Sequence, residues 1–375
     1  MKKFILILCV CIRTVSYAQY SEEDALRPFS GFLGHLPQST AIGGAGVAAG
    51  QVMPELSLNP ANIAMTKFRI LRGAYGSSEF TSGSQSLPQN RISHITYIHS
   101  IPVFRGHLSW GTGITQDLEY ALKYQTSSYS QRNEGNSYTF HLAGATEFAK
   151  DLFIGADFQV PFGDFTVTAT DYDLNTILLV EPSFLGISGK VGLSYILTPF
   201  LNIGLSAQLP QKLWVSEDNT EVFGDTLVIN YKPFDYTLTR PLELQFGAAL
   251  LFKWFDVFYQ ADAINWSGLK WDSEESEFFD QEINSGIEEN FKRTLTHRMG
   301  FAVHPPFLPI NLYGGYQYRP NQRKNEDPTY VYSAGFSWLL RQTVNISTSW
   351  QTWDWKYNNQ DESWDQFLLA IEFIF

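Results

Sequence analysis

Apolar and polar residues alternate along most of the chain from about residue 67 onward, with a period of two rather than the 3.6 of a helix. The pattern is clear in the last ten residues, whose apolar face consists of Phe367, Leu369, Ile371, Phe373 and Phe375. Similar runs occupy residues 152–160, 242–250, 255–263, 310–318 and 344–350. Successive side chains of a strand point to opposite faces, so each run predicts a strand with one apolar face.

The connections between these runs are of two kinds. Tight turns are expected at Lys150-Asp151, Thr198-Pro199, Lys253-Trp254 and Leu340-Arg341. Longer polar segments are expected at 117–135, 216–238, 267–292, 320–328 and 355–364. About fourteen strands fit between residues 65 and 375, and short turns on one rim with long loops on the other are typical of an outer-membrane β-barrel.

The predicted fold class is therefore all-β, an antiparallel outer-membrane barrel; the alternative is a soluble β-sandwich or propeller, which also alternates. The predicted strands are about 10–12 residues long, whereas globular strands average about five or six. Tryptophans near strand ends would form girdles at the lipid headgroups. These are Trp110, Trp214, Trp254, Trp266, Trp338, Trp353 and Trp355. The terminal Phe375 resembles the signal read by the barrel-assembly machinery.

Residues 1–18 predict a secretory signal peptide. A basic start at Lys2-Lys3 precedes an apolar run at 4–12 and a small-x-small cleavage site at Ser16-Tyr17-Ala18. Both cysteines of the chain lie inside this leader. The mature chain, expected to begin at Gln19, then has neither a disulfide nor a thiolate metal site.

The composition narrows the function classes. The chain has 17% charged residues, 15% aromatic residues and a net charge of −12, which argues against nucleic acid as a partner because a phosphate-binding surface needs a basic footprint. The mean hydropathy is −0.15 and no later run of apolar residues reaches about 18, so no transmembrane helix is expected. A barrel explains these values, because it averages an apolar outer face with a polar lumen.

The segment before the first strand, residues 19–64, has a different pattern. A short helix is expected at Glu22–Leu26, and a run of small residues at 41–50 contains four glycines. This glycine run lacks the Lys-Ser/Thr of a phosphate-binding loop and no βα unit surrounds it. The apolar residues between the two are Phe29, Phe32, Leu33 and Leu36.

The order of three motifs in this segment resembles the FadL/TodX family of outer-membrane transporters for long-chain fatty acids and aromatic hydrocarbons. The motifs are Ala25-Leu26-Arg27-Pro28-Phe29-Ser30, the stretch from Ser39 to Ala48, and Leu58-Asn59-Pro60-Ala61-Asn62-Ile63-Ala64. The family commonly has Asn-Pro-Ala-Gly, and Asn62 stands here at the position of that glycine.

The resemblance implies that residues 19–64 form a hatch inside a barrel of residues 65–375, and that a hydrophobic ligand leaves sideways into outer-membrane lipid. The alternative for residues 19–64 is an exposed periplasmic leader. A wide barrel needs a plug, since its wall side chains cannot fill it. The expected ligand-binding residues are Phe29, Phe32, Leu33 and Leu36, and the hatch motif comprises Gly43, Gly44, Gly46, Asn59 and Pro60.

Gly111 and Gly113 are candidates for the lateral gate, because paired glycines weaken a strand and favour bulges. The alternative is that these glycines simply make space for the hatch.

No catalytic residue, metal site or cofactor is expected. None of the seven histidines has a partner at a metal-ligand spacing, no Gly-x-Ser-x-Gly elbow is present, and His107 with His141 lacks a third placed group.

Two function classes remain open. The first is a passive channel for a hydrophobic small molecule, either a fatty acid or a neutral or aromatic hydrocarbon. The second is a PorV-like or PorQ-like component of type IX secretion, or a surface scaffold, which would bind proteins through loops 216–238 and 267–292 with aromatic residues such as Trp214, Trp271, Phe278 and Phe279. Carboxylates predicted to face the lumen would repel a fatty-acid anion and favour a neutral ligand. These are Asp157, Glu243, Asp256 and Asp262.

Overall fold

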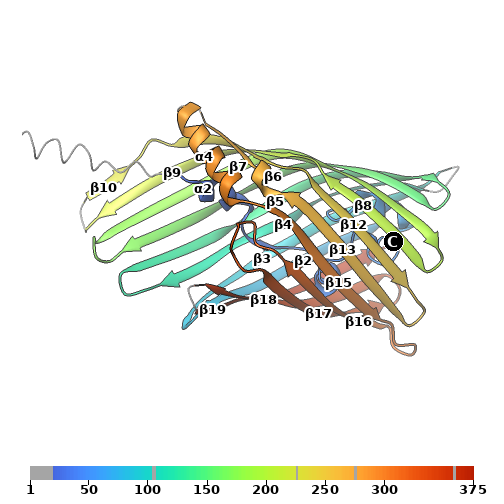
Figure 1. Ribbon diagram of the computed structural model, residues 1–375. Coiled ribbons are helices and arrows are strands. Elements are labelled where there is room, and N and C mark those ends of the chain that lie inside the picture. Colours follow the sequence, from blue (N-terminus) through green and yellow to red (C-terminus); the bar gives the residue numbers. More distant parts are fainter. Residues whose placement is uncertain (1–19, 104–106, 225–226, 274–276, 358–359) are drawn as a thin grey trace, which may run out of the picture.

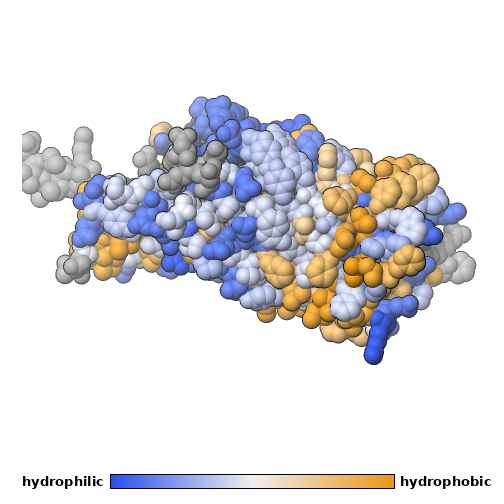
Figure 2. All heavy atoms as spheres, turned by 90° about the horizontal axis from the view of Figure 1, so that it is seen from below, coloured by the Kyte–Doolittle hydropathy of each residue, from blue (hydrophilic) through white to orange (hydrophobic). Residues whose placement is uncertain are grey.

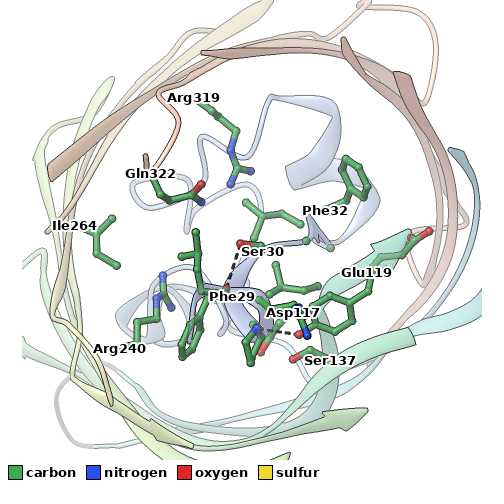
Figure 3. A pocket seen from close by; sticks show the side chains of 18 of the residues that line it. Phe29, Ser30, Phe32, Asp117, Glu119, Ser137, Arg240, Ile264, Arg319 and Gln322 are labelled. Atoms are coloured by element: carbon green, nitrogen blue, oxygen red, sulfur yellow. Dashed lines mark hydrogen bonds between the residues drawn. The ribbon is translucent and has the colours of Figure 1, made fainter. Parts of the chain in front are cut away.

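The computed structural model describes residues 20–375, except 104–106, 225–226, 274–276 and 358–359. The predicted signal peptide lies outside the described residues. The chain forms a closed antiparallel β-barrel, with the N-terminal segment running inside it (Figures 1 and 3). The barrel predicted from the alternation is confirmed.

The N-terminal segment contains α2 (Glu22–Leu26), η1 (Arg27–Phe29), β1 (Phe32–Leu33), α3 (Pro37–Ala41) and η2 (Pro60–Met65). The undivided wall strands are β2 (Ile70–Ser82), β3 (Gln85–Pro102), β4 (His107–Gln125), β5 (Tyr129–Ala149), β6 (Leu152–Asp171), β7 (Thr176–Thr198), β15 (Arg293–Val303), β16 (Ile310–Arg319), β17 (Thr329–Leu340), β18 (Val344–Tyr357) and β19 (Gln360–Ile374). The remaining elements are β8 (Leu201–Gln208), β9 (Gln211–Phe223), β10 (Leu227–Asn230), β11 (Phe234–Arg240), β12 (Glu243–Leu251), β13 (Phe255–Asn265), η3 (Trp266–Gly268), β14 (Lys270–Ser273) and α4 (Glu277–Asn290).

Three wall strands are each divided into two segments. Strand β7 pairs with β8 near one rim and with β9 near the other, and β8 and β9 pair in turn with β12 and β11. Strands β13 and β14 make the third such pair, next to β12 and β11. Counting each pair as one strand gives a wall of fourteen strands.

The barrel closes between its first and last strands. Strand β19 pairs with β2 from Ile374↔Ile70 to Glu362↔Ser82. The terminal Phe375 extends this seam, because its backbone N–H donates to Arg69 at 2.9 Å and its carbonyl accepts from Arg69 at 3.2 Å. The Arg72 guanidinium forms an ion pair with Glu372 across the same seam and donates to the Pro54 carbonyl of the hatch segment.

Side chains of the wall alternate between an exposed apolar outer face and a buried polar inner face. On β12, for example, Leu244 and Phe246 are exposed, whereas Glu243 and Gln245 are buried. The four carboxylates predicted to face the lumen are all buried. Figure 2 shows apolar residues gathered toward one end of the visible face and hydrophilic residues toward the other, so the apolar belt covers only part of the barrel's height.

The predicted long loops are wrong in part. Residues 117–135 belong mostly to the β4–β5 hairpin, 216–238 to β9, β10 and β11, and 355–364 to the β18–β19 hairpin. The wall is consequently uneven: β5 and β7 have 21 and 23 residues, whereas β15 and β16 have 11 and 10. Residues 129–136 of β5 and 216–221 of β9 are almost entirely polar, so no apolar alternation marks them as strands.

Segment 267–292 contains β14 and the 14-residue helix α4 instead of a simple loop. Ile283 and Ile287, one helical turn apart, are buried under α4 with Phe291. The predicted helix at Glu22–Leu26 is confirmed; Ser21 caps it in a capping box with Asp24. In the described part of the chain, no helix is long and apolar enough to cross a membrane.

Candidate functional site

A cavity of about 730 Å³ lies between the upper part of the N-terminal segment and the barrel wall (Figure 3). Ser57 and Leu58 border it on the side of the short-turn rim, and Glu23, Arg323 and Glu326 border it at the long-loop rim. The segment therefore divides into two regions. We call residues 20–36 the upper hatch and residues 37–65 the lower hatch.

Three of the four predicted ligand-binding residues line this cavity: Phe29, Phe32 and Leu33. Phe29 is buried beside Trp266, with ring centroids 6.2 Å apart. The fourth, Leu36, is buried elsewhere, against Ala74 and Ala370 of the wall.

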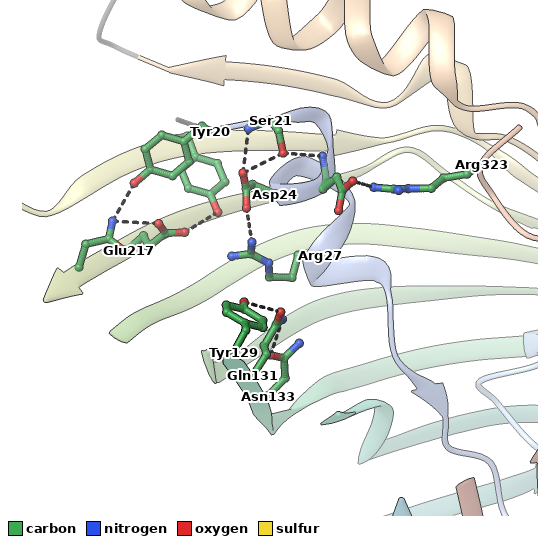
Figure 4. Close-up of polar contacts among 12 residues, drawn as sticks. Tyr20, Ser21, Asp24, Arg27, Tyr129, Gln131, Asn133, Glu217 and Arg323 are labelled. Atoms are coloured by element: carbon green, nitrogen blue, oxygen red, sulfur yellow. Dashed lines mark hydrogen bonds and ion pairs between the residues drawn. The ribbon is translucent and has the colours of Figure 1, made fainter. Parts of the chain in front are cut away.

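The upper hatch is anchored at the long-loop rim by polar and aromatic contacts (Figure 4). The hydroxyl of Tyr20 accepts a hydrogen bond from Asn219 at 2.9 Å, and its ring stacks on Phe234 at 4.3 Å. Glu23 forms an ion pair with Arg323 of the loop after β16. These contacts hold α2 at the mouth of the barrel beside α4.

The cavity has a balanced charge. Six acidic residues line it (Glu23, Asp117, Glu119, Glu243, Asp262 and Glu326), and so do six basic residues (Arg27, Lys190, Arg240, Arg298, Arg319 and Arg323). An anion in this cavity would meet as many basic as acidic side chains, so the lumen carboxylates do not by themselves exclude a fatty acid. Each of the four carboxylates has a partner, namely His141 for Asp157, Arg240 for Glu243, His304 for Asp256 and Arg298 for Asp262.

Arg319 differs from the other four cavity-lining arginines, each of which forms an ion pair with a carboxylate. Its guanidinium lies over the Trp353 ring, 4.4 Å from the centroid, and points into the cavity in Figure 3. Within the described residues, Arg319 has no carboxylate partner and its Nη1 donates no hydrogen bond. Burial and the charge of Arg298 lower the pKa of His35 well below its usual value, so its imidazole is neutral. The Nε2 atom of His35 lies 3.2 Å from Arg298 Nη1 and accepts a hydrogen bond from it.

The hatch-motif residues build the lower hatch. Asn59 caps η2 by accepting from the Ala61 N–H at 3.0 Å, and its amide donates to the Val47 carbonyl at 2.9 Å and the Ser194 hydroxyl at 3.0 Å. Pro60 occupies the first turn of η2, where its missing N–H costs nothing. Asn62, at the position of the family glycine, accepts from Ser194 at 2.8 Å and thus ties the motif to the wall.

Two glycines of the motif have left-handed backbone conformations, which L side chains rarely adopt. Gly43 has φ +67° and Gly44 has φ +71°. A Cβ at Gly43 would lie 2.9 Å from backbone atoms of Met299 and Tyr316, and its N–H donates to the Ser333 hydroxyl at 3.1 Å. The third glycine, Gly46, packs closely against Leu58. The lower hatch therefore packs backbone-to-backbone against β15–β17.

The wall shows no interruption at the two glycines predicted for a lateral gate. The β3–β4 ladder runs through Ile98↔Gly111 and Thr96↔Gly113, and it ends at His94↔Thr115. Gly111 faces the hatch, 3.1 Å from Leu56 as measured from the Cβ position. Beyond Thr115 the backbone of β3 pairs only with β2, and β4 bulges between Gln116 and Leu118.

Side chains replace the missing β3–β4 ladder above Thr115. Arg91 of β3 forms an ion pair with Glu119 of β4, and its Nε donates to Gln116 at 2.6 Å. Gln89 donates to the Tyr120 carbonyl at 3.1 Å. On the lumen side, β1 of the upper hatch pairs with the freed edge of β4, with Phe32 opposite Glu119 and Leu33 opposite Leu118.

Three of the seven tryptophans predicted for the headgroup girdles lie elsewhere. Trp110, Trp214, Trp254 and Trp338 are exposed on the outer face, as expected. Trp266 and Trp353 are buried, and Trp353 and Trp355 line the cavity. Strand alternation indicates this position for two of them. Trp350 is exposed on the outer face of β18, so Trp353 and Trp355, three and five residues later, face the lumen. Trp271, expected at a protein-binding surface, is buried against Tyr236 with ring centroids 3.9 Å apart.

The histidines of the wall serve structural roles. His141 lies between Asp157, at 2.7 Å, and Thr115, at 2.9 Å, which links β4, β5 and β6. His107 lies near the other rim, where its neighbour Leu108 pairs with Thr146. Among the described residues, no group of three or more His, Cys, Asp or Glu is placed to hold a metal ion.

Comparison with known proteins identifies the fold. No protein-family model matches the chain, and no curated protein does. Among solved structures, the Ralstonia pickettii toluene transporter TbuX matches with a TM-score of 0.68 at 16% identity, covering 91% of this chain and 98% of that one. The CymD monoaromatic hydrocarbon channel matches at 0.64 with 16% identity over 91% and 98% of the two chains. A Pseudomonas aeruginosa FadL homologue matches at 0.64 with 11% identity over 92% and 99%. The chain has the fold of FadL-type outer-membrane barrels.

Proposed function

We propose that this chain is a passive outer-membrane channel that holds a hydrophobic or amphiphilic small molecule between hatch and wall and releases it laterally. The cavity above the lower hatch is the observation that carries this proposal. It is bordered by the long-loop rim on one side and by a densely packed hatch on the other. A solute entering from outside would meet the cavity before it meets the seal.

The lateral exit is proposed between β3 and β4, above His94 and Thr115. Only side chains and β1 close the wall there, so opening it breaks no wall ladder. Gly111 and Gly113 would then lie just below the exit, where they leave room for the hatch. Ile92 and Ile114 are exposed on the outer face at the lower end of this gap, so a molecule leaving there would meet the apolar belt.

The proposed ligand combines an apolar body with a polar or anionic end, or has an apolar body alone. Phe29, Phe32 and Leu33 supply apolar contacts, and the unpaired Arg319 suits a carboxylate. Because Glu243 and Asp262 form ion pairs with Arg240 and Arg298, and as many basic as acidic residues line the cavity, a fatty acid is as suitable as a neutral hydrocarbon. No cofactor or energy coupling enters this proposal.

Uptake by cells expressing the full chain tests the proposal. A strain lacking its own FadL-type proteins should take up dodecanoate and toluene faster with the chain than with an empty vector. Thr296→Trp, which fills the cavity from β15, should abolish the gain. Leu295→Trp adds the same ring to the exposed outer face of β15 and is the matched control. Uptake equal to the empty vector, with folded protein in the outer membrane, would reject the channel.

A surface scaffold is the second candidate, and exposed apolar side chains at the long-loop rim favour it. Leu174 is 74% exposed at the β6–β7 tip, and Phe278 is 77% exposed on α4. A secretion role predicts that a deletion strain takes up both probes normally but loses proteins from its surface. Signal-peptide removal before Gln19 and recognition of Phe375 by the assembly machinery belong to either candidate.

A further inference from the structure

The ring of Phe32 sits in a box of three tryptophans. It stacks on Trp364 with centroids 4.5 Å apart and an interplanar angle of 4°, and it meets Trp353 edge-on at 5.2 Å and 83°. Trp355 adds a tilted contact at 5.6 Å. Stacked and edge-to-face arrangements are those that aromatic rings prefer, so the box is shaped for a flat ring on three sides.

The box opens onto the cavity through Phe32. Phe32, Trp353 and Trp355 line the cavity, whereas Trp364 is fully buried beneath the Phe32 ring. If Phe32 left, the face of Trp364 would be exposed to the cavity. Refilling the box with another flat ring would restore these contacts, and an aliphatic group of equal size would restore only the apolar burial.

The box is also connected to the side chains that close the β3–β4 gap. The Trp364 indole N–H donates to Glu119 at 3.2 Å, and Glu119 forms the ion pair with Arg91. The backbone of β1 pairs with Glu119 and Leu118, and the Gly34 N–H donates to the Asp117 carbonyl at 3.0 Å. The position of Phe32 thus sets whether β1 covers the freed edge of β4.

We propose that Trp353, Trp355 and Trp364 form a binding subsite for a flat aromatic ring, which Phe32 occupies as an internal ligand until an incoming ring displaces it and frees β1 from β4. The subsite itself stands on the ring geometry. Only the release of β1 rests on the proposed lateral exit.

Binding to the purified full chain in detergent tests the subsite, with toluene and methylcyclohexane as probes of equal size with and without a π face. Phe32→Ala vacates the box and should bind toluene about tenfold more tightly than the wild type, with a gain below about threefold for methylcyclohexane. Tyr20→Ala removes a ring of the upper hatch that stacks on Phe234 and does not line the cavity, so it should leave toluene binding within about twofold.

Phe32→Leu is the control for a hatch that merely becomes looser. It keeps an apolar side chain in the box, so its gain in toluene affinity should be smaller than that of Phe32→Ala. Equal gains for both probes, or the same gain in Tyr20→Ala, would overturn the subsite. Hydrogen exchange of β1 and of Leu118 and Glu119 should rise when toluene saturates the wild type; unchanged exchange would overturn the displacement. Uptake in cells is a separate measurement, so a chain that binds toluene in the box but transports nothing refutes the proposed function and leaves the subsite standing.

Discussion

The two halves of the hatch are built differently. The lower hatch packs small residues and backbone directly against the wall, with Asn59 and Asn62 bonded to Ser194 and Gly43 bonded to Ser333. The upper hatch touches the wall through aromatic rings, the short β1–β4 pairing and the Glu23–Arg323 ion pair, and it borders the cavity.

This difference follows from how each half satisfies the hydrogen bonds of its buried main chain. Buried main-chain groups must be hydrogen-bonded, so a half that fills the barrel needs a specific partner for nearly every group and loses its freedom to move. Ring contacts are less directional and another ring can replace them. The lower hatch is therefore suited to sealing, and the upper hatch to exchange with a ligand.

The wall next to the upper hatch should show the largest effect. Arg91→Met leaves Glu119 buried without its cation, and we expect it to lower the free energy of unfolding by about 3–5 kcal/mol. Adding Glu119→Leu should recover most of this loss, since an apolar pair can replace a buried ion pair. Urea unfolding in vesicles, followed by tryptophan fluorescence, measures both. A double variant no more stable than Arg91→Met would show that the pair does not act as a unit.

The contrast between the halves predicts unequal costs for alanine at two glycines. Gly43→Ala in the lower hatch combines a left-handed φ with backbone contacts at 2.9 Å, and we expect a loss of about 2–4 kcal/mol and a leaky barrel. Gly34→Ala in the upper hatch places a Cβ 2.6 Å from the Gln116 carbonyl, but β1 can shift into the cavity, so about 1 kcal/mol is expected.

Unfolding and single-channel conductance measure this pair, with Gly83→Ala as control. Gly83 has φ +58° in an open turn, so its substitution carries only the backbone term of about 1 kcal/mol and no leak. Equal losses at Gly43 and Gly34 would contradict the division of the hatch into a rigid and an exchangeable half.

A smaller effect is expected from the free cation beside the cavity. Arg319→Gln should weaken binding of dodecanoate about tenfold and of dodecanol less than twofold, because only the carboxylate gains a charge-assisted hydrogen bond. Arg323→Gln, which removes a cation already paired with Glu23, is the control. Titration calorimetry in detergent gives both affinities, and equal weakening of the two probes would mean that Arg319 holds no carboxylate.

The smallest effect concerns the short-turn rim. Burial disfavours the charged form of His304, but hydrogen bonds to Asn311 and Asp256 and the charge of Asp256 outweigh it and raise the pKa of His304 above its usual value. A raised folded-state pKa gives stability that is present below the unfolded value of about 6.5 and is lost as pH rises through the folded value. Because the site is partly exposed, we expect less than about 1 kcal/mol.

His304→Gln should therefore be less stable than the wild type at pH 5, and the two should converge toward pH 9. Thermal unfolding across this range measures the difference. If the stability difference between the wild type and His304→Gln grew with rising pH, the result would contradict a protonated His304 held by Asp256.

How much of the fold can be predicted from the sequence differs between the apolar belt and the parts of the barrel beyond it. The alternation at 242–250 predicts a strand because its apolar residues face one way; the turn at Lys150-Asp151 and the helix at Glu22–Leu26 depend on neighbouring residues alone. The polar parts of the long hairpins, such as 129–136 and 216–221, carry no such signature, and the loop predictions failed there for this reason. Residues 117–125 do alternate, with Leu118, Tyr120, Leu122 and Tyr124 at every second position, so this strand was predictable from the pattern.

The sequence by itself determined the barrel and its approximate strand number, since these rest on periodicity. From short motifs it also predicted a hatch with Phe29, Phe32 and the Gly43-to-Pro60 motif. Only the tertiary structure decided which tryptophans surround Phe32, which side chains pair with the lumen carboxylates and where the β3–β4 ladder ends. Trp364 and Phe32, or Arg91 and Glu119, meet because barrel closure brings distant segments to one level. No local pattern specifies that register, because it is set by the pairing of all the strands at once.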